Sequence, residues 1–150
     1  MASNGVTISG VSDLVKGFKD FNDKIAKNQS IGARLAANEY KNDVQAKTTE
    51  IGLYKKGDYR RSIHVEPTSG AFEDSNGPYC VTGTDNVAAR QHEFGGVIKA
   101  KNAPYLVFQT EDGAWHKVKA VTQPPHPHFQ PALDENGGKY IRIMKEAMLR

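Results

Sequence analysis

The segment Pro124-Pro-His-Pro-His-Phe-Gln-Pro-Ala-Leu-Asp-Glu-Asn136 decides how the last third of this chain folds. Its first three prolines bias the residue before each of them away from the helical region, so the segment begins extended. Pro131 falls in the first turn of a helix, where a backbone amide has no intrahelical partner. We therefore expect a rigid extended strut that delivers Phe129 as a buried anchor and leads into a terminal helix from about Pro131.

The terminal helix has an apolar stripe that is interrupted by Gly137 and Gly138, which we expect to shorten or kink it. The stripe consists of Leu133, Tyr140, Ile141, Met144 and Met148.

The first third of the chain has the pattern of a long amphipathic helix. Ser12 and Asp13 offer N-cap side chains, and a stripe with four-three-four spacing follows them. The pattern weakens at 28–30 and resumes afterwards, which predicts either one long helix or two nearly collinear ones with a break near Asn28–Gly32. The stripe is Leu14, Phe18, Phe21 and Ile25, and it resumes with Ile31, Leu35 and Ala36 before it fades through Tyr40 and Val44.

Between these helices the chain alternates short β-prone runs with turn-forming residues. A short run at Val6–Ser9, then Ser62–Glu66, Tyr79–Gly83, Tyr105–Thr110 and Ala114–Val121 are predicted strands. The Gly- and acid-rich loop at 67–78 predicts a long-tipped hairpin. A short helix should end at Phe94, because two glycines follow it and supply a left-handed stop.

These patterns together predict an α+β fold, in which the N-terminal and C-terminal helices pack on an antiparallel sheet of about four strands. The length of 150 residues suits a single domain with its own core, with the 67–78 loop and a 96–121 hairpin extension as its protruding parts.

Composition narrows the class of protein. Hydrophobic residues make up 38% and the formal net charge is only +3, which is short of the excess expected of a dedicated nucleic-acid binder. A single cysteine, Cys80, excludes an internal disulfide and fits a reducing cytosol. No run approaches the length of about 18 apolar residues that a membrane span needs, so we expect no membrane association.

Three short motifs, taken in order, resemble those of the neck and tail-completion (head–tail joining, minor tail) proteins of long-tailed bacteriophages. They are Lys56-Gly57-Asp58-Tyr59-Arg60-Arg61-Ser62-Ile63, His92-Glu93-Phe94-Gly95, and the strut through Leu133. This chain departs from the family at Lys56, where Thr or Ser is usual, and at Tyr59, where Leu is usual. Its longer 96–121 segment is more like the virion-morphogenesis proteins of contractile-tailed phages.

The resemblance implies a non-enzymatic structural protein of the virion, made in the host cytoplasm. It implies that copies form a homo-oligomeric ring at the head–tail junction or the head-proximal end of the tail, in contact with neighbouring neck or tail proteins. For this assembly interface we expect Tyr105, Phe108, Trp115 and Phe129.

The residues give no support for a catalytic or cofactor site. His126 and His128 alternate faces in an extended strut, and His92, Glu93 and His116 would have to converge from other elements to complete a metal site. We therefore expect no metal and no cofactor. Cys80 has no base in sequence reach and is interpreted as a small buried hydrophobe, and Glu93 as a helix-end carboxylate that bonds a neighbouring amide or pairs with an arginine.

One basic cluster, Lys55, Lys56, Arg60 and Arg61, has two interpretations. It is either a solvated turn that keeps a strand edge from pairing wrongly, or a surface for nonspecific contact with DNA in a lumen or with acids of a neighbour. The alternative hypothesis for the whole protein follows from the second one. It is a small cytosolic nucleic-acid-binding module with Tyr54, Tyr59 and Tyr79 as its stacking surface.

Overall fold

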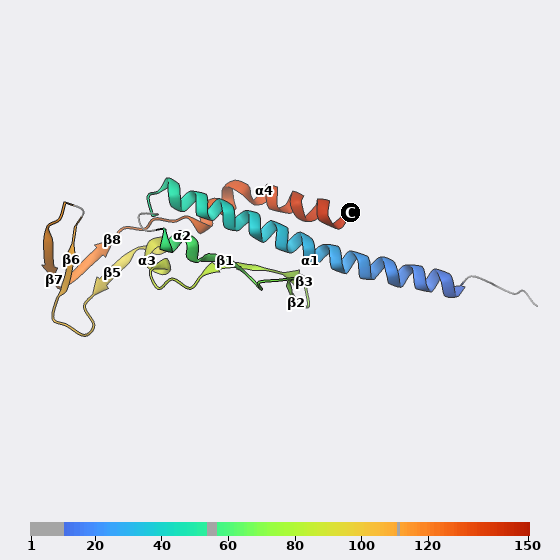
Figure 1. The fold of residues 1–150 in the computed structure, drawn as a ribbon, viewed down its shortest axis with the longest axis horizontal. Helices are drawn as coiled ribbons and strands as arrows, with labels where there is room; N and C mark the ends of the chain where they lie inside the picture. The colour runs from blue at the N-terminus through green and yellow to red at the C-terminus, as the bar shows by residue number, and fades with distance from the viewer. Residues whose placement is uncertain (1–10, 54–56, 111) are drawn as a thin grey trace, which may run out of the picture. The chain divides into compact units, whose positions relative to one another are not determined.

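The computed structural model describes residues 11–53, 57–110 and 112–150 of the chain (Figure 1). The predicted strand at Val6–Ser9 lies outside these residues. In chain order the elements are α1 (Val11–Glu50), α2 (Asp58–Ser62), β1 (Ile63–Glu66), β2 (Phe72–Asp74), β3 (Gly77–Tyr79), β4 (Val81–Thr84), α3 (Ala89–Phe94), β5 (Gly96–Lys99), β6 (Leu106–Gln109), β7 (Trp115–Val118), β8 (Ala120–Gln123) and α4 (Phe129–Met148).

The α+β class is confirmed, with a long N-terminal helix, a C-terminal helix and small antiparallel sheets. The sheet differs in organisation from the expectation of about four strands. The described strands form four two-stranded sheets, β1 with β4, β2 with β3, β5 with β8 and β6 with β7. Each strand has only three or four residues, and turns or glycines end it before a second neighbour can pair.

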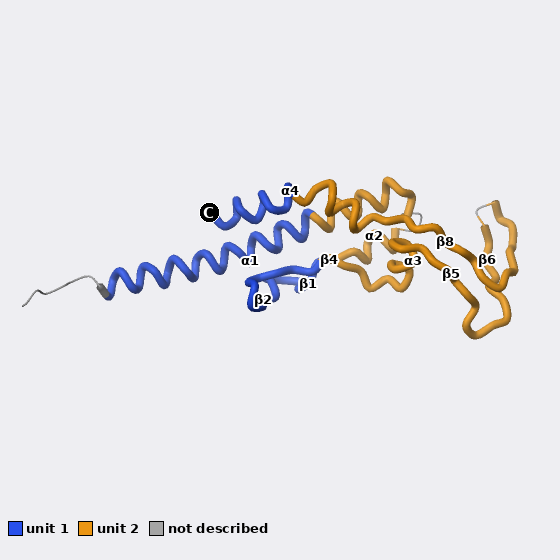
Figure 2. Tube along the Cα trace, turned by 180° about the vertical axis from the view of Figure 1, so that it is seen from behind, with its two compact units in different colours: residues 1–39, 65–81, 138–150 blue, residues 40–64, 82–137 orange. Residues whose placement is uncertain are grey.

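The chain clusters into two compact units (Figure 2). Unit 1 comprises residues 1–39, 65–81 and 138–150, and unit 2 comprises 40–64 and 82–137. Both α1 and α4 run through the division, so neither unit is a separate stretch of sequence. The expected single domain stays a prediction.

Helix α1 is one continuous helix, so the first of the two predicted alternatives is confirmed and there is no break near Asn28–Gly32. No proline interrupts it. Gly32 does not break the helix and instead lies where another helix packs. A Cβ there would lie 3.2 Å from the Cβ of Ala147 and 3.2 Å from the carbonyl oxygen of Met144. The glycine therefore allows the C-terminal end of α4 to approach α1 closely.

In the unit 1 part of α1, the buried face is not the one that the large apolar residues mark, whereas Tyr40 and Val44 of the same stripe do pack in the core of unit 2. Small residues face inward in unit 1, namely Gly32, Ala33, Ala36 and Ala37. The predicted stripe is exposed at Leu14, Phe18, Phe21, Ile31 and Leu35, with Ile25 half-buried. Close helix packing selects small side chains, and that requirement outweighs the apolar spacing of the stripe.

Unit 1 also contains a hairpin inside the segment that was predicted as a loop at 67–78. Strands β2 and β3 pair in register from Phe72 opposite Tyr79 to Asp74 opposite Gly77. The two aromatic rings lie 5.5 Å apart. At the tip, the backbone amide of Asn76 donates to the Asp74 carboxylate over 2.7 Å. Tyr79 therefore belongs to this hairpin, and the strand predicted at Tyr79–Gly83 is β4.

Arg34 of α1 ties this segment down within unit 1. Its guanidinium donates to the backbone carbonyls of Pro67, Thr68 and Gly70. One planar fork of donors thus binds three carbonyls of the same segment, of which the Gly70 carbonyl also accepts from the Cys80 thiol.

The core of unit 2 is small. Its buried cluster is Val44, Tyr59, Ile63 and Ala132, and the half-buried residues packed against it are Tyr40, Leu53, Ala89 and Phe129. These residues come from α1, α2, β1, α3 and α4, so the core joins segments that are far apart in the sequence.

Strands β5 to β8 form a continuous segment of unit 2, residues 96–123, that we call the β arm. Strand β5, Gly96–Lys99, was not predicted, and the long strand predicted at Ala114–Val121 is divided near Lys119 into β7 and β8. Strand β5 pairs with β8, and β6 pairs with β7. The predicted glycine turn between β6 and β7 is present, with Gly113 in the left-handed region at φ 84°.

Among the residues that the structure describes, no helix combines the length and the apolar character needed to cross a bilayer.

Candidate assembly surfaces and the buried polar node

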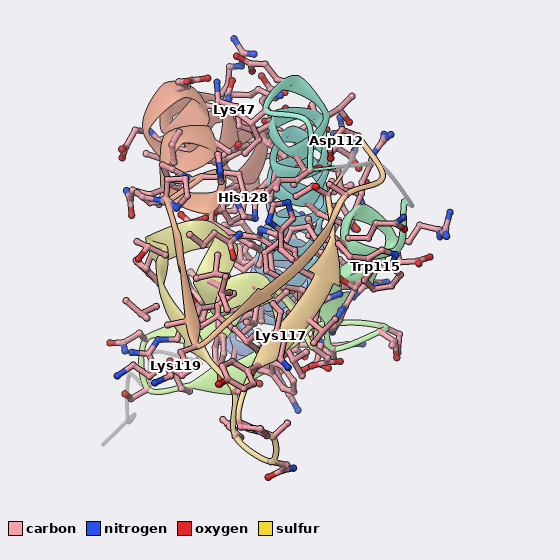
Figure 3. The ribbon with its side chains drawn as sticks, turned by 90° about the vertical axis from the view of Figure 1, so that its left-hand side faces the viewer. Lys47, Asp112, Trp115, Lys117, Lys119 and His128 are labelled. Carbon is pink, nitrogen blue, oxygen red and sulfur yellow. The ribbon has the colours of Figure 1, made fainter. Side chains whose placement is uncertain are left out.

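The β arm presents apolar and aromatic side chains on both of its faces. Phe108 lies opposite His116 in the register of β6 and β7, and their rings stack 5.6 Å apart. Trp115 lies opposite Gln109, one residue further along, so it points to the other face of the hairpin. Trp115 is 70% exposed (Figure 3).

Tyr105 precedes β6 and belongs to the same part of the arm. The ammonium group of Lys117 lies 4.5 Å from the centre of the Tyr105 ring, which is a cation–π contact. The structure therefore places Tyr105, Phe108 and Trp115 in or beside one hairpin, on different faces, and their role in an interface stays a prediction.

A pocket of about 310 Å³ lies within the β arm. It is lined entirely by apolar residues, Ile98, Leu106, Val107, Phe108 and Val121. Ile98 and Val121 pair directly across β5 and β8. The arm therefore has a small apolar hollow as well as an exposed aromatic side chain.

Phe129, the fourth residue expected at the interface, lies in a different place. It is half-buried against the core cluster of unit 2, and its ring makes an edge contact with Tyr40 at 6.4 Å. The Tyr40 hydroxyl also donates to the Phe129 carbonyl over 2.9 Å. Phe129 does pin the strut, but the fully buried residue of the strut is its neighbour, His128.

His128 is the centre of a polar cluster that we call the node. It is 0% exposed, and its Nε2 lies 2.7 Å from the hydroxyl of Tyr59. Its Nδ1 lies 3.0 Å from the Glu93 carboxylate and 2.9 Å from the carbonyl oxygen of His126. Both neighbours of Nδ1 are acceptors, so Nδ1 carries the proton and Nε2 accepts from Tyr59.

Burial, with the nearby Glu93 carboxylate, raises the pKa of Tyr59 to about 12, which keeps the phenol protonated as this arrangement requires. Burial lowers the pKa of His92, and so do the neighbouring His128 and His126. The His92 ring lies 4.9 Å from that of Tyr59. The node therefore gathers two imidazole rings and a phenol around one carboxylate.

Glu93 also caps helix α4. Its carboxylate accepts from the backbone amides of His128, Phe129 and Gln130, at 2.9, 3.2 and 3.3 Å. These are amides of the first turn of α4, which have no acceptor inside the helix. A carboxylate there also complements the positive end of the helix dipole. The expected role of Glu93, bonding neighbouring amides, is confirmed.

Gly95 allows the strut to meet α3 at short range. Its φ of 66° is in the left-handed region, and a Cβ there would lie 2.7 Å from both the Gln123 carbonyl oxygen and the Pro125 nitrogen. Nearby, the amide of His126 donates to the carbonyl of His92 over 2.6 Å. No other residue type fits at position 95 without moving the strut.

The node brings together the three motifs found in the sequence. Tyr59 comes from the first motif, Glu93 and Gly95 from the second, and His128 from the strut. Tyr59, Glu93 and His128 are more than 30 residues from one another along the chain, so helical or strand periodicity carries no signal for their contact. Of these three residues, only Glu93 was interpreted from the sequence as a residue that makes a buried polar contact.

The node has the residue types of an acid–base relay, but its chemistry is enclosed. Tyr59 and His128 are both buried. Cys80, half-buried, has a thiol whose pKa is raised chiefly by burial. The arrangement can hold a strut and cap a helix. That the protein is not an enzyme stays a prediction.

The described residues contain no group of three or more His, Cys, Asp or Glu side chains placed to hold a metal ion. His92, Glu93 and His128 do converge, but the ring nitrogens of His128 are occupied by the node. His116 belongs to the β arm, where its Nε2 lies 3.1 Å from the Thr110 hydroxyl. The absence of a metal and of a cofactor stays a prediction.

The basic cluster is only partly described, since Lys55 and Lys56 lie outside the described residues. Arg61 forms an ion pair with Asp58 three residues earlier, and the exposed Arg60 follows the buried Tyr59. Tyr59 is inside the core. One of the three tyrosines expected to stack on nucleic acid is therefore not on the surface. Tyr54 also lies outside the described residues.

Comparisons with protein-family models, with curated proteins and with solved structures found no match to this chain.

Proposed function

We propose that this protein is a structural subunit of the neck or the head-proximal tail of a long-tailed bacteriophage, where copies of it form a ring. The role is geometric: each subunit offers apolar surface to a neighbour, and no chemical reaction is involved.

The observation that carries the proposal is where the apolar side chains lie. The largest fully buried side chains are Ile63, His128, Val44 and Thr48, and two of these four are polar. Large apolar side chains are exposed instead in both units, among them Leu14, Phe18 and Phe21 in unit 1 and Val97, Val107 and Trp115 in unit 2. Monomeric proteins rarely expose apolar patches beyond a few hundred Å², so surface of this kind suggests an assembly.

Two further observations support this particular assembly. The three motifs on which the resemblance to the phage family rests all contribute to the node or to the strut. They therefore act together in this fold. The β arm follows α3 and precedes the strut, at the place where the longer members of the family carry an extension.

The test is to locate the chain in the particle. We expect a reconstruction of the virion encoded with this protein to contain it as a ring in the neck or tail, and its absence there would contradict the proposal. Trp115 is the only tryptophan in the chain. Its fluorescence should therefore shift to shorter wavelength when the purified protein assembles, if the arm enters an interface.

Deletion of residues 110–115 sharpens the test. The deletion removes the tip of the β arm and leaves the node and both helices, so we expect normal far-UV circular dichroism and no incorporation into particles. Particles that incorporate the deleted protein would show that the arm is not the interface. Loss of DNA binding in a gel-shift salt series, with assembly retained, would favour the nucleic-acid-binding alternative.

A further inference from the structure

A pocket of about 450 Å³ lies beside helix α3 in unit 2, and we call it the α3 pocket. Three aromatic residues, Tyr40, Phe94 and Phe129, contribute to its lining. Tyr40 and Phe129 are in edge contact, whereas Phe94 is 75% exposed. The volume is within the range of about 300–1,000 Å³ that is usual for ligand sites in proteins. Aromatic rings prefer edge or offset contacts with one another, so this lining suits a further aromatic ring.

The α3 pocket also has a cation in its lining. Arg90 lies four residues before Phe94 on α3, so the two side chains are neighbours on one face of that helix. Arg90 is exposed and has no ion-pair partner among the residues that the structure describes. The carboxylate of Glu93, which also lines the pocket, already binds three backbone amides of α4 and the ring of His128. The charge that the pocket offers to a ligand is therefore the guanidinium of Arg90, which pairs with carboxylates.

An acceptor for an N–H group belongs to the same pocket. Gln130 contributes to the lining, and its amide nitrogen donates to the Asp134 carboxylate over 2.7 Å. The carbonyl oxygen of the Gln130 side chain is then the atom that remains to accept from a ligand. A ligand that uses the aromatic lining, this oxygen and the guanidinium is a large aromatic ring with an N–H donor and a carboxylate close by. A tryptophan near an acidic residue has this chemistry.

The tip of the β arm carries such a pair. Trp115 is 70% exposed, and its indole nitrogen is a donor only. Asp112 lies three residues earlier, in the turn between β6 and β7. Its carboxylate accepts from the Thr110 hydroxyl over 2.5 Å and from the Ala114 amide over 3.3 Å, and its side chain is exposed. Three residues span at most about 10 Å, so the acid and the indole can enter one site together.

Two other pockets fit this tip less well. The pocket within the β arm has an entirely apolar lining, so it offers no partner to the indole N–H or to the carboxylate. The pocket of unit 1 that is lined by Phe21 and Arg150 has a cation but a single aromatic residue. The α3 pocket therefore matches the tip better than either of them.

The contact is one between copies, because Trp115 remains exposed within its own chain. Trp115 and the α3 pocket both belong to unit 2, and Trp115 is not among the residues that line the pocket. A chain that carries the two halves of a contact at different places binds the next copy head to tail. Such contacts close into a ring or continue as a filament.

We propose that the tip of the β arm of one copy docks in the α3 pocket of a second copy of this chain. The Trp115 indole packs against Phe94 in the aromatic lining and donates its N–H to the side-chain carbonyl of Gln130. The Asp112 carboxylate pairs with Arg90. The inference rests on the proposed function for the arm as an interface, and it adds the site that receives the arm.

The first experiment exchanges the two charges between copies of the full chain, followed by sedimentation velocity over a concentration series. Arg90→Glu and Asp112→Arg each place like charges across the contact, so we expect each variant alone to associate roughly fivefold more weakly than the parent or worse. An equimolar mixture should associate as the parent does, because every arm of one variant then meets a complementary pocket on the other. Both side chains are exposed, so neither change disturbs the core.

The second experiment removes the aromatic half of the contact. A tryptophan at the centre of an interface is typically a dominant residue, so we expect Trp115→Ala to associate at least about thirtyfold more weakly. Trp115 is the only tryptophan in the chain, so its emission reports the site directly. In the parent the emission should shift to shorter wavelength as the concentration rises, and Phe94→Ala should abolish that shift.

Two matched controls change residues outside the contact. Phe21→Ala removes an exposed ring from the unit 1 pocket, and Lys145→Glu reverses an exposed charge on α4. Both should associate as the parent does. Far-UV circular dichroism checks that every variant is folded.

Four results would overturn the inference: a parent that stays monomeric, a Trp115→Ala variant that associates like the parent, a mixture no stronger than its components, or an emission shift that is independent of concentration. A Phe94→Ala variant that keeps the shift would also overturn it, since the arm then enters another site, and the proposed function would stand. Absence of the chain from the neck and tail of the virion contradicts the proposed function instead, and leaves the contact between purified copies unchanged.

Discussion

The node of unit 2 and the exposed apolar stripe of α1 in unit 1 (Leu14, Phe18 and Phe21) differ in the kind of side chain that they bury. The node buries a histidine, a tyrosine and a carboxylate and satisfies each of them with a partner. The stripe leaves leucine and phenylalanine in solvent. Folding of the single chain therefore satisfies the polar groups of the node and leaves these apolar side chains exposed. The predictions below test whether the contacts within the node hold the strut in the isolated chain.

The largest effect is expected from Glu93→Ala. The change removes three acceptor contacts at the start of α4 and the partner of the His128 ring, while Glu93 itself is only 11% exposed. Each buried donor left without an acceptor costs about 1–3 kcal/mol, so we expect about 3 kcal/mol of lost stability in total. Chemical denaturation followed by circular dichroism measures it.

Glu73→Ala in β2 is the control, because Glu73 is exposed, and we expect it to change stability by less than about 0.5 kcal/mol. If Glu93→Ala is as stable as this control, the node does not hold the strut.

A smaller loss is expected from Tyr59→Phe. It keeps the ring in the core and removes only the hydroxyl that donates to His128 Nε2, leaving a buried acceptor without a donor. An unsatisfied buried group costs about 1–3 kcal/mol. Tyr79→Phe, at an exposed tyrosine, should have almost no effect in the same denaturation experiment. Equal midpoints for the two variants would argue against a closed node.

The smallest effect is a dependence on pH. Since the pKa of His92 is lowered in the folded protein, the unfolded chain binds this proton more readily. Stability is therefore present in full above the unfolded value of about 6.5 and declines as pH falls below it. Melting temperatures between pH 7 and pH 5 should fall, and His92→Gln should lessen the fall. A variant with the parent's pH dependence would assign that dependence to other groups.

Local rules predicted the parts of the fold that depend on neighbouring residues. The stop at Gly95, the turn at Gly113 and the extended strut before α4 all follow from backbone conformations that only glycine or proline favours, and all three are present. The β5 strand was missed because four residues, two of them apolar, carry too little periodicity to be recognised.

Spacing could not show which apolar face of α1 is covered. Leu35 and Ala36 are neighbours in the sequence, and the smaller one is buried because α1 packs closely within unit 1. The node could not be predicted either, since Tyr59, Glu93 and His128 come from separate elements. For the same reason Phe129 was assigned the fully buried position that His128 holds.

Gly95 has a consequence for how this protein can diversify. The β arm leaves the chain directly after Gly95 and returns at Gln123, whose carbonyl oxygen would lie 2.7 Å from a Cβ at position 95. The two ends of the arm are thus adjacent in the backbone, which is the arrangement that tolerates insertion and replacement of a segment. The arm can lengthen, shorten or be exchanged between relatives as a cassette, without disturbing Tyr59, Glu93 or His128. If the arm is an interface, as we propose, its specificity for a neighbouring protein can change while the rest of the fold stays the same.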